Sequence, residues 1–222
     1  MNTNEKLELL KKAKDAYYNS GEEILTDLEY DQLEEELGLE NQTEIGSHSI
    51  NYTIKHPYIM GSLSKVQIKE ENKTIDWNKF YSEILKYVGT NTPLIVTPKY
   101  DGCSFETIVE NSKIISISTR GDGEYGKDIY NHLINKFDQT HTQIKNILTN
   151  TIDTTGTYTL RGEVLVNKNK FQNSKFIDQF ANPRSFVSAT LNRDFDKDDK
   201  ELYDMIELLD IVIYDIRKKD NK

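Results

Sequence analysis

The sequence predicts an α+β protein, with helices first and an antiparallel sheet after them. Two segments near the N-terminus, residues 4–18 and 26–37, place apolar side chains at helical spacing. Farther along, residues 105–109 and 114–118 alternate on either side of Asn111-Ser112, which is typical of a β-hairpin. Strands joined by a tight turn are antiparallel, so we expect an antiparallel sheet.

Composition limits the classes of protein to which the chain can belong. Its 222 residues are enough for one sizeable domain, or for a domain with a small appendage. The start of the chain shows no signal peptide, no apolar run is long enough to span a membrane, and the single Cys103 fits a reducing compartment. We therefore expect an intracellular protein of the cytoplasm, a nucleoid or a viral factory, with no membrane partner. A net charge of −9 argues against a free-standing, non-specific nucleic-acid binder.

Residues 1–45 are expected to form a helical hairpin. Gly21 ends the first helix, and Thr26 with Glu29 predicts a capping box for the second. Aromatic and acidic side chains can converge within this hairpin, and such a set suits a flat, cationic ring that bears hydroxyl groups. These side chains are Tyr17, Tyr18, Asp27, Tyr30 and Asp31. The alternative is that the tyrosines form the core of the hairpin.

A loop and two further helices are predicted in the middle of the chain. Residues 55–66, KHPYIMGSLSKV, are rich in Pro, Gly and Ser and predict an extended loop, in which His56 alone indicates nothing. Residues 76–88 predict a helix that ends at Gly89. Residues 127–149 also have a helical pattern.

The stretch LIVTPKYDGCSF places one lysine between two predicted strands. A β-rich run, residues 94–96, ends in a proline and is followed by Lys99, with Asp101 and Gly102 behind it. Lysine is a nucleophile only as the free amine, and its unperturbed pKa of about 10.4 keeps it protonated in water. Neighbouring cations or a metal ion favour the free amine, and Asp101 could orient the lysine or hold the metal. The alternative is an exposed lysine ahead of an Asp-Gly turn.

The segment TRGDGEYG contains Gly121, Gly123 and Gly126 in the spacing G-x-G-x-x-G. This spacing also occurs in dinucleotide-binding folds. Because the preceding strand comes from a hairpin rather than from a βαβ unit, we reject that interpretation. We predict a tight loop that lets Arg120 and Asp122 approach a phosphate or a ribose.

The strand predicted over residues 157–166, TYTLRGEVLV, carries two charged side chains. Arg161 and Glu163 point to one face of the strand by its two-residue period. A glutamate facing inward from a strand is costly unless it is paired or bound to ligand hydroxyls. Two interpretations of Glu163 stay open, namely a ligand contact and an ion pair with a neighbouring arginine.

The C-terminal part predicts one helix, one turn and one strand. Asn182-Pro183 opens a helix with Arg184 in its first turn. The acidic run of residues 194–199 lacks the glycine and the final glutamate of a calcium loop, so we predict a solvated turn. Residues 207–216, ELLDIVIYDI, have an apolar centre and predict a buried strand.

Six motifs follow one another along the chain, in the order YYNSGEEILTDLEYDQL, HPYIMGSLSK, KYDG, TRGDGEYGKD, LRGEV and FANPRS. In this order they resemble the N-terminal adenylation region of the NAD+-dependent DNA ligases, over essentially the whole chain. The paired tyrosines and aspartates of the first motif are the most specific feature, since they separate NAD+ users from ATP-dependent relatives. The resemblance implies a hairpin over residues 1–45 that binds nicotinamide mononucleotide (NMN). It also implies an incomplete, ATP-grasp-like nucleotidyltransferase core over residues 46–222, with antiparallel sheets and flanking helices.

The resemblance further implies a reaction and the residues that carry it. Lys99 matches the lysine that attacks the α-phosphorus of NAD+ to form lysyl-AMP and release NMN, and Asp101 and Gly102 complete its motif. Positioning and charge neutralisation do most of the work in such a phosphoryl transfer, and magnesium is expected on the phosphates. No side chain is matched to a metal ligand. The other matches contact NAD+: Ser62 and Leu63 beside the adenosine, Arg120 near the nucleotide, Glu163 on the ribose, Arg184 on the nucleotide and DNA side, and Tyr17, Tyr18, Asp27, Tyr30 and Asp31 around the NMN half.

Several positions depart from the family pattern. Thr97 stands where a glutamate usually reads the adenine, Tyr18 replaces a frequent histidine, and Asn192 replaces a second arginine, with Arg193 one position later. The family's next two motifs, which each bring a lysine to the pocket, do not occur in these residues, nor do its OB-fold, zinc, helix-hairpin-helix and BRCT regions. Removing one preorganised charge donor costs about 10²–10³ in rate. We therefore expect NAD+ affinity before turnover, and nick sealing last of all.

The sequence thus predicts the adenylation domain of an NAD+-dependent DNA ligase, which serves nick sealing in replication and repair. NAD+ is the expected substrate, and nicked DNA is a partner only with additional domains or a partner chain. Three alternatives stay open. They are a non-catalytic remnant that binds NAD+ or NMN, one half of a split ligase, and a nucleotidyltransferase that uses ATP and another acceptor such as RNA.

Overall fold

The computed structural model describes most of the chain, in two compact units. The described residues are 1–16, 24–39, 52–61, 73–89, 92–93, 95–137 and 156–219. The larger unit comprises Met1–Gly61 and Tyr100–Lys222, and the smaller unit comprises Ser62–Lys99. Each unit is described by itself.

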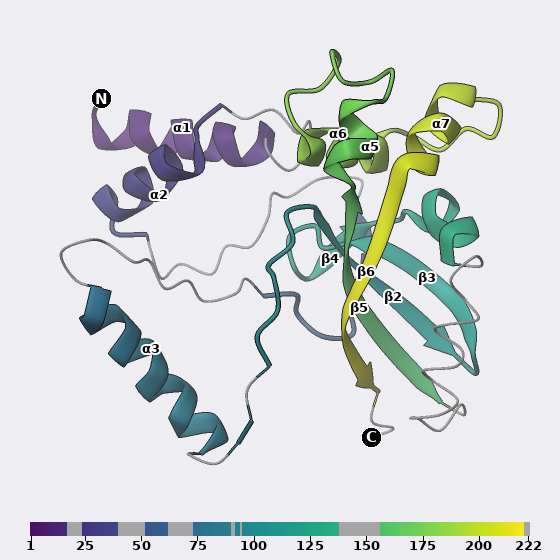
Figure 1. Cartoon of the computed structure of the whole chain (residues 1–222). Helices are drawn as coiled ribbons and strands as arrows, with labels where there is room; N and C mark the ends of the chain where they lie inside the picture. The colour runs from purple at the N-terminus through teal and green to yellow at the C-terminus, as the bar shows by residue number, and fades with distance from the viewer. Residues whose placement is uncertain are drawn as a thin grey trace. The chain divides into compact units, whose positions relative to one another are not determined.

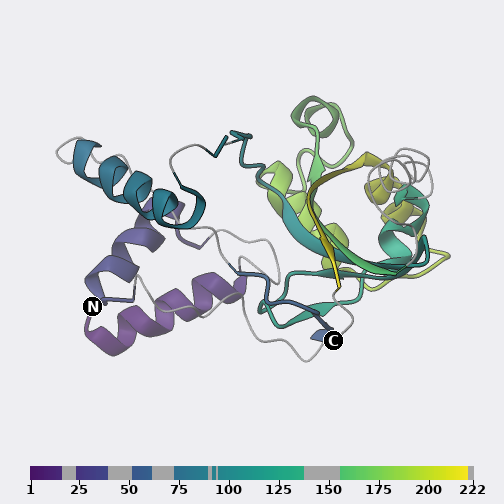
Figure 2. The ribbon, with the colours of Figure 1, turned by 90° about the horizontal axis from the view of Figure 1, so that it is seen from below.

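A four-stranded sheet forms the centre of the larger unit (Figure 1). Its strands are β2 (Cys103–Glu110), β3 (Lys113–Thr119), β5 (Thr157–Val166) and β6 (Leu209–Lys218). They lie in the order β3-β2-β5-β6, and every neighbouring pair is antiparallel. Seen from below in Figure 2, the strands form a curved band. Together with the helices, this sheet confirms the predicted α+β class.

The β2–β3 connection is the two-residue turn that the sequence predicts. Asn111 and Ser112 have positive φ angles of 47° and 64°. Two such residues in a row make a type I′ turn, whose twist matches that of the strands beside it. The predicted hairpin is therefore confirmed, with Glu110 paired to Lys113 across the turn.

The hydrophobic core lies on one face of this sheet. Phe105 of β2, Ile117 of β3 and Val164 of β5 are fully buried in it. Helical residues 130–137, α6 (Pro183–Asn192) and α7 (Lys200–Leu208) supply the other half of the core. Within it, the ring of Phe186 lies 5.4–5.5 Å, between centroids, from three other aromatic rings, those of Phe171, Phe176 and Phe180.

Strand β5 is buried over most of its length, from Tyr158 to Val164. Its central residue is Gly162, where a Cβ atom would lie 2.2 Å from the carbonyl oxygen of Val212 and 2.6 Å from the ring of Phe105. Both distances are far below van der Waals contact. Glycine at this position lets β5 lie between its neighbours without displacing either.

Two helices are described near the N-terminus, α1 (Thr3–Asp15) and α2 (Asp27–Glu36), and they pack against each other. The capping box predicted for the second helix is confirmed. The amide of Glu29 donates to Thr26 Oγ1 over 3.3 Å, and the amide of Thr26 donates to the Glu29 carboxylate over 2.8 Å. The division of the chain at residue 45 falls in residues 40–51, outside the described ranges, and stays a prediction.

A second, small sheet pairs β1 (Tyr52–Lys55) with β4 (Tyr125–Lys127) in antiparallel register. The segment TRGDGEYG therefore ends in a strand, with Gly126 inside β4 rather than at the start of a helix. This arrangement confirms the rejection of a dinucleotide-binding fingerprint. It also places a strand where the sequence predicts the beginning of a loop.

Three predictions about the C-terminal part need correction. Helix α7 and the short helix α5 (Lys168–Gln172) were not predicted, and β6 begins at Leu209 rather than at residue 207. The last residue of the acidic run explains where α7 begins. Asp199 caps that helix by accepting a hydrogen bond from the amide of Leu202 over 3.0 Å, so the run ends in a helix start as well as a turn.

The smaller unit contains one described helix, α3 (Lys73–Val88), which ends at Gly89 with a φ of 74°, as predicted. The strand predicted over residues 94–96 is wrong for Ile95 and Val96, which lie in no strand and are 90% and 94% exposed. Pro93 and Pro98 flank this stretch, and proline removes a donor that a strand needs for pairing.

Candidate functional site

The face of the central sheet opposite the core carries four polar residues at the β2–β5 pair. Ser104 and Glu106 of β2 lie directly opposite Glu163 and Arg161 of β5, respectively. Cross-strand partners share a face, so these side chains gather in one place, which we call the polar patch. Its three charged members are at most 8% exposed, and charges that deeply buried require partners.

The partners inside the polar patch distinguish its two glutamates. Arg161 Nε donates to Glu106 Oε2 over 2.7 Å, whereas Ser104 Oγ donates to Glu163 Oε2 over 2.9 Å. The arginine next to Glu163 in the strand therefore bonds the other carboxylate. Glu163 accepts from a hydroxyl, which is the kind of donor that a ribose presents.

Asp101 and Arg184, both predicted site residues, form an ion pair at the edge of this region. Arg184 Nη1 donates to Asp101 Oδ1 over 2.8 Å. The arginine comes from the first turn of α6, which Asn182 caps as predicted. The Asp101 side chain is 78% exposed, and a pair this exposed contributes only about 0–1 kcal/mol, so a ligand can replace either partner at little cost.

The pKa of the Cys103 thiol depends on three of these charged side chains. Burial raises the pKa of Cys103 to about 11; the nearby Arg184 cation opposes this shift, and the Glu163 and Asp101 carboxylates add to it. The contacts agree with this grouping, because Arg184 bonds Asp101 and the next residue, Gly102, lies against the Cγ atom of Glu163. The structure thus brings together Asp101, Glu163 and Arg184, which the sequence places in three separate motifs.

Gly102 is also a predicted site residue, and the structure gives it a steric role. A Cβ atom at this position would lie 2.1 Å from the carbonyl oxygen of Val164 and 3.0 Å from Glu163 Cγ. Glycine therefore lets the chain before β2 run directly against β5.

Arg120 begins the tight loop that the sequence predicts. Its amide donates to the carbonyl oxygen of Ser104 over 2.9 Å, which joins the loop to the polar patch. Asp122 Oδ1 accepts from the amides of Glu124 and Tyr125 over 2.9 and 2.7 Å. This oxygen therefore stabilises the loop itself, while the approach of Arg120 and Asp122 to a ligand stays a prediction.

Tyr214 of β6 is a site candidate that the sequence analysis missed. The β5–β6 register shifts there, because Arg161 pairs with Asp215 and Gly162 with Ile213, which makes Tyr214 the extra residue of a β-bulge. Burial raises the pKa of its phenol, as does the Glu163 charge, while a hydrogen bond with the Ser104 side chain opposes the shift. The apolar run of residues 207–216 gave no signal of a bulge.

Lys99 lies in the smaller unit, at its last position. Residues 95–99 form no helix or strand, and the Lys99 side chain is exposed. The boundary between the units falls between Lys99 and Tyr100, so the structure describes the lysine separately from Asp101, two residues on.

The NMN half of the predicted site stays a prediction. Tyr17, Tyr18, Ser62 and Leu63 lie outside the described residues. Asp27, Tyr30 and Asp31 belong to α2, and Tyr30 is partly buried there.

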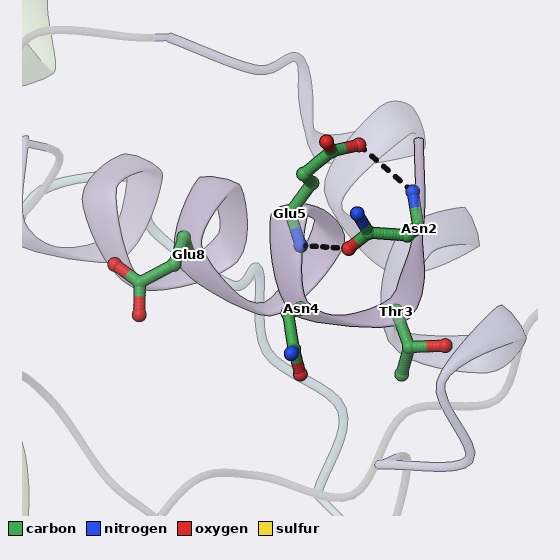
Figure 3. Close-up of a pocket in the computed structure, with 5 residues that line it drawn as sticks. All are labelled: Asn2, Thr3, Asn4, Glu5 and Glu8. Carbon is green, nitrogen blue, oxygen red and sulfur yellow. Dashed lines mark hydrogen bonds between the residues drawn. The ribbon is translucent and has the colours of Figure 1, made fainter.

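A hollow of about 640 Å³ lies at the start of α1 (Figure 3). Its lining consists of Asn2, Thr3, Asn4, Glu5 and Glu8. Figure 3 shows that Asn2 and Glu5 bond each other reciprocally as the capping box of the helix. The hollow is thus the surface of a well-capped helix start.

The described ranges contain neither a metal cluster nor a membrane-spanning helix. In those ranges, no three His, Cys, Asp or Glu side chains lie together in a way that could hold a metal ion. Within the same ranges, no helix has the length and apolar character needed to cross a membrane.

Comparison with known proteins identifies the family. Residues 49–222 match the family model described as the NAD-dependent DNA ligase adenylation domain. The chain belongs to this family. The match includes the KYDG, TRGDGEYGKD, LRGEV and FANPRS motifs, and it confirms the family that the sequence motifs indicated.

Relatives of this adenylation-domain chain occur in viruses and bacteria. A protein designated 205R from Invertebrate iridescent virus 6 is 39% identical over 191 residues, which cover 86% of this chain and 26% of the relative. The DNA ligase of Acanthamoeba polyphaga mimivirus is 30% identical over 97% of this chain and 31% of its own length. The DNA ligase of Helicobacter pylori (strain J99) is 30% identical, over 85% and 30%. The chain therefore spans about a quarter to a third of the length of these relatives.

Proposed function

We propose that this chain carries out the self-adenylation step of an NAD+-dependent DNA ligase. The free amine of Lys99 attacks the α-phosphorus of NAD+, and a P–N bond forms as the bridging P–O bond breaks. NMN leaves with the electron pair of that bond, and the attacking nitrogen gives up one proton. The product is lysyl-AMP, which supplies AMP for nick sealing in DNA replication and repair inside the cell.

The observation that carries the proposal is the convergence of three motifs at one end of the β2–β5 pair. Asp101, Glu163 and Arg184 come from KYDG, LRGEV and FANPRS; Arg184 bonds Asp101 over 2.8 Å, and Gly102 of KYDG lies against the Cγ atom of Glu163. Such convergence is what a nucleotide site requires, because carboxylates bind sugar hydroxyls and guanidinium groups bind phosphates. Membership of the NAD-dependent family supports NAD+ as the nucleotide.

In this proposal each residue has a separate task. Glu163 binds ribose hydroxyls, Arg120 and Arg184 neutralise phosphate charge, and Asp101 orients the attacking lysine. The half-exposed ring of Tyr214 offers a surface on which a purine can stack. The residues predicted to contact the adenosine and the NMN half, Ser62, Leu63, Tyr17, Tyr18, Asp27, Tyr30 and Asp31, complete the proposed site.

Magnesium enters the proposal as a partner of the NAD+ phosphates. In the described ranges no three metal-binding side chains lie together, so the proposal assigns the magnesium to the phosphates of NAD+ rather than to a cluster of these side chains. Phosphate oxygens and water are the usual remaining ligands of Mg²⁺. Bound magnesium would supply charge neutralisation at the transferred phosphate.

The test is transfer of a label from the AMP half of NAD+ to the protein. We expect a labelled band with the wild-type chain and none with Lys99→Ala, while Lys113→Ala, which changes an exposed lysine in the β2–β3 turn, keeps the label. Parallel reactions with labelled ATP separate the NAD+ and ATP alternatives.

Two outcomes would contradict the proposal. One is labelling that persists in Lys99→Ala. The other is an unlabelled wild-type chain even when a second polypeptide supplies the remaining ligase motifs. NAD+ binding by calorimetry without any label would instead favour a non-catalytic binding remnant.

A further inference from the structure

His56 lies in the segment 56–60, which follows β1, and its imidazole ring is enclosed by the protein. The residue is 5% exposed. Its Nδ1 lies 3.0 Å from Glu106 Oε1, and its Nε2 lies 3.1 Å from the carbonyl oxygen of Arg120. A Cβ atom at Gly126 would come within 3.2 Å of Nε2, so the ring has no room to turn away on that side.

The two contacts of His56 determine which atoms donate. A carbonyl oxygen only accepts, and an ionised carboxylate also only accepts. Arg161 donates to the second oxygen of Glu106. A hydrogen bond from His56 to each of its two acceptors requires that the ring nitrogen facing that acceptor be the donor.

The same charges hold the segment 56–60 against the sheet. Arg161 Nη2 donates to the carbonyl oxygen of Tyr58 over 2.5 Å, and Nη1 donates to that of Ile59 over 3.2 Å. At its end, the amide of Met60 donates to the carbonyl oxygen of Gly123 over 2.9 Å. The segment is thus bonded both to the polar patch and to the loop that begins at Arg120.

We propose that His56, Glu106 and Arg161 form a buried charge relay that positions two backbone segments, one of which belongs to the proposed nucleotide site. That one is the loop of residues 120–123, which His56 holds through the Arg120 carbonyl. The other is the segment 56–60, which Arg161 holds through the carbonyl oxygens of Tyr58 and Ile59. The three are positioning residues; their effect on NAD+ rests on the proposed function, whereas their hold on the two backbone segments does not.

The charged and titratable groups around the ring all take part in this relay. Glu106 faces it from β2, and Arg161 faces Glu106 from β5. The Arg120 carbonyl faces it from the loop after β3. The Arg120 carbonyl also accepts from the amide of Gly123 over 3.0 Å, so losing the His56 donor removes one of its two partners. For this loss we expect about a tenfold effect on local opening or binding.

Two substitutions of His56 separate its two contacts. In His56→Gln the side-chain amide reaches the position of Nε2 and keeps the bond to the Arg120 carbonyl. In His56→Asn it reaches only the position of Nδ1, so the bond to Glu106 stays and the bond to Arg120 is lost. Lys55→Ala is the matched control, because it changes the neighbouring residue, whose exposed ion pair with Glu124 lies outside the relay.

Amide hydrogen exchange of Met60 and Gly123 is the first measurement. We expect about tenfold faster exchange in His56→Asn and rates close to wild type in His56→Gln and Lys55→Ala. NAD+ binding by calorimetry is the second measurement, with about a tenfold higher Kd expected in His56→Asn alone. Equal exchange rates in His56→Asn and His56→Gln would overturn the inference, even if the wild-type chain binds no NAD+, which would count against the proposed function instead.

A ¹⁵N spectrum of the wild-type histidine ring gives a result that does not depend on whether His56→Asn folds. We expect chemical shifts that show a hydrogen bond at both ring nitrogens of His56. A ring with one bare nitrogen would contradict the donor assignment and with it the relay.

Discussion

The two buried glutamates of the polar patch, Glu106 and Glu163, differ in their hydrogen-bond partners. Both oxygens of Glu106 bond protein groups, one with His56 and one with Arg161. Glu163 bonds the hydroxyl of Ser104, which a ribose hydroxyl can replace. Loss of activity on substitution would not by itself separate a ligand contact from a structural one at either position.

The raised pKa of Cys103 predicts a particular pH dependence of stability. The thiol titrates at about pH 11 in the folded chain and at about pH 8.5 when unfolded. Between these values the folded chain binds more protons than the unfolded chain, so the free energy of unfolding falls as the pH rises, by at most about 1.4 kcal/mol per pH unit. Below about pH 8.5 this contribution is fully present.

Urea unfolding of the wild-type chain and of Cys103→Ala, each at neutral pH and at about pH 10, measures this contribution as the difference between the two chains. Tyr214 also has a raised pKa and acts in the same direction in both chains, so it cancels. A difference that does not change with pH would show that Cys103 ionises as readily in the folded state.

At the scale of elements, the approach of the chain to β5 at Gly102 predicts a steric effect. Gly102→Ala places a Cβ atom 2.1 Å from the carbonyl oxygen of Val164, and overpacking of this kind typically costs about 1–3 kcal/mol. Gly61→Ala is the control, because a Cβ atom there meets nothing within 4 Å. Denaturant unfolding of both variants measures the difference, and equal stabilities would show that β5 moves freely to accommodate the methyl group.

Local signals predicted several elements correctly. The Asn111-Ser112 turn, the Thr26–Glu29 cap and the end of α3 at Gly89 each depend on residues close together in the chain. The missed elements depend on more distant contacts. Helix α7 packs its apolar side into the core beside α6, and its sequence joins an acidic run to a strand without a visible break.

The motifs name candidate site residues, but they do not predict the contacts that those residues make. Asp101, Glu163 and Arg184 followed from motifs, whereas the pairing of Ser104 with Glu163 depends on the register between β2 and β5. Register is set by the whole sheet, and a one-residue shift would turn each side chain to the other face. For the same reason, the sequence does not predict the contacts of His56, whose two partners are 50 and 64 residues away.

For the whole molecule, we predict that the chain takes up AMP but does not seal nicks on its own. Its net charge of −9 opposes binding to DNA, whose affinity for proteins rests largely on phosphate contacts. A nicked duplex incubated with the chain and NAD+ should therefore stay nicked on a denaturing gel.

Adding a second polypeptide that carries the remaining ligase motifs should restore sealing, and Lys99→Ala should prevent it. Sealing by the chain alone would show that 222 residues suffice to hold both the nucleotide and the DNA. Lower salt is the condition most favourable to that result, because it strengthens any contact with phosphates.

Gly162 has a consequence for how mutational surveys of this chain would be interpreted. Any side chain there collides with β6 on one side and with Phe105 on the other, so nearly every substitution should inactivate the protein. A map of tolerated substitutions would then place Gly162 among the most sensitive positions, beside Lys99, the proposed nucleophile. Glycine nevertheless has no side chain with which to take part in the reaction. Measuring protein abundance alongside activity would distinguish a residue that is required for folding from one that takes part in the reaction.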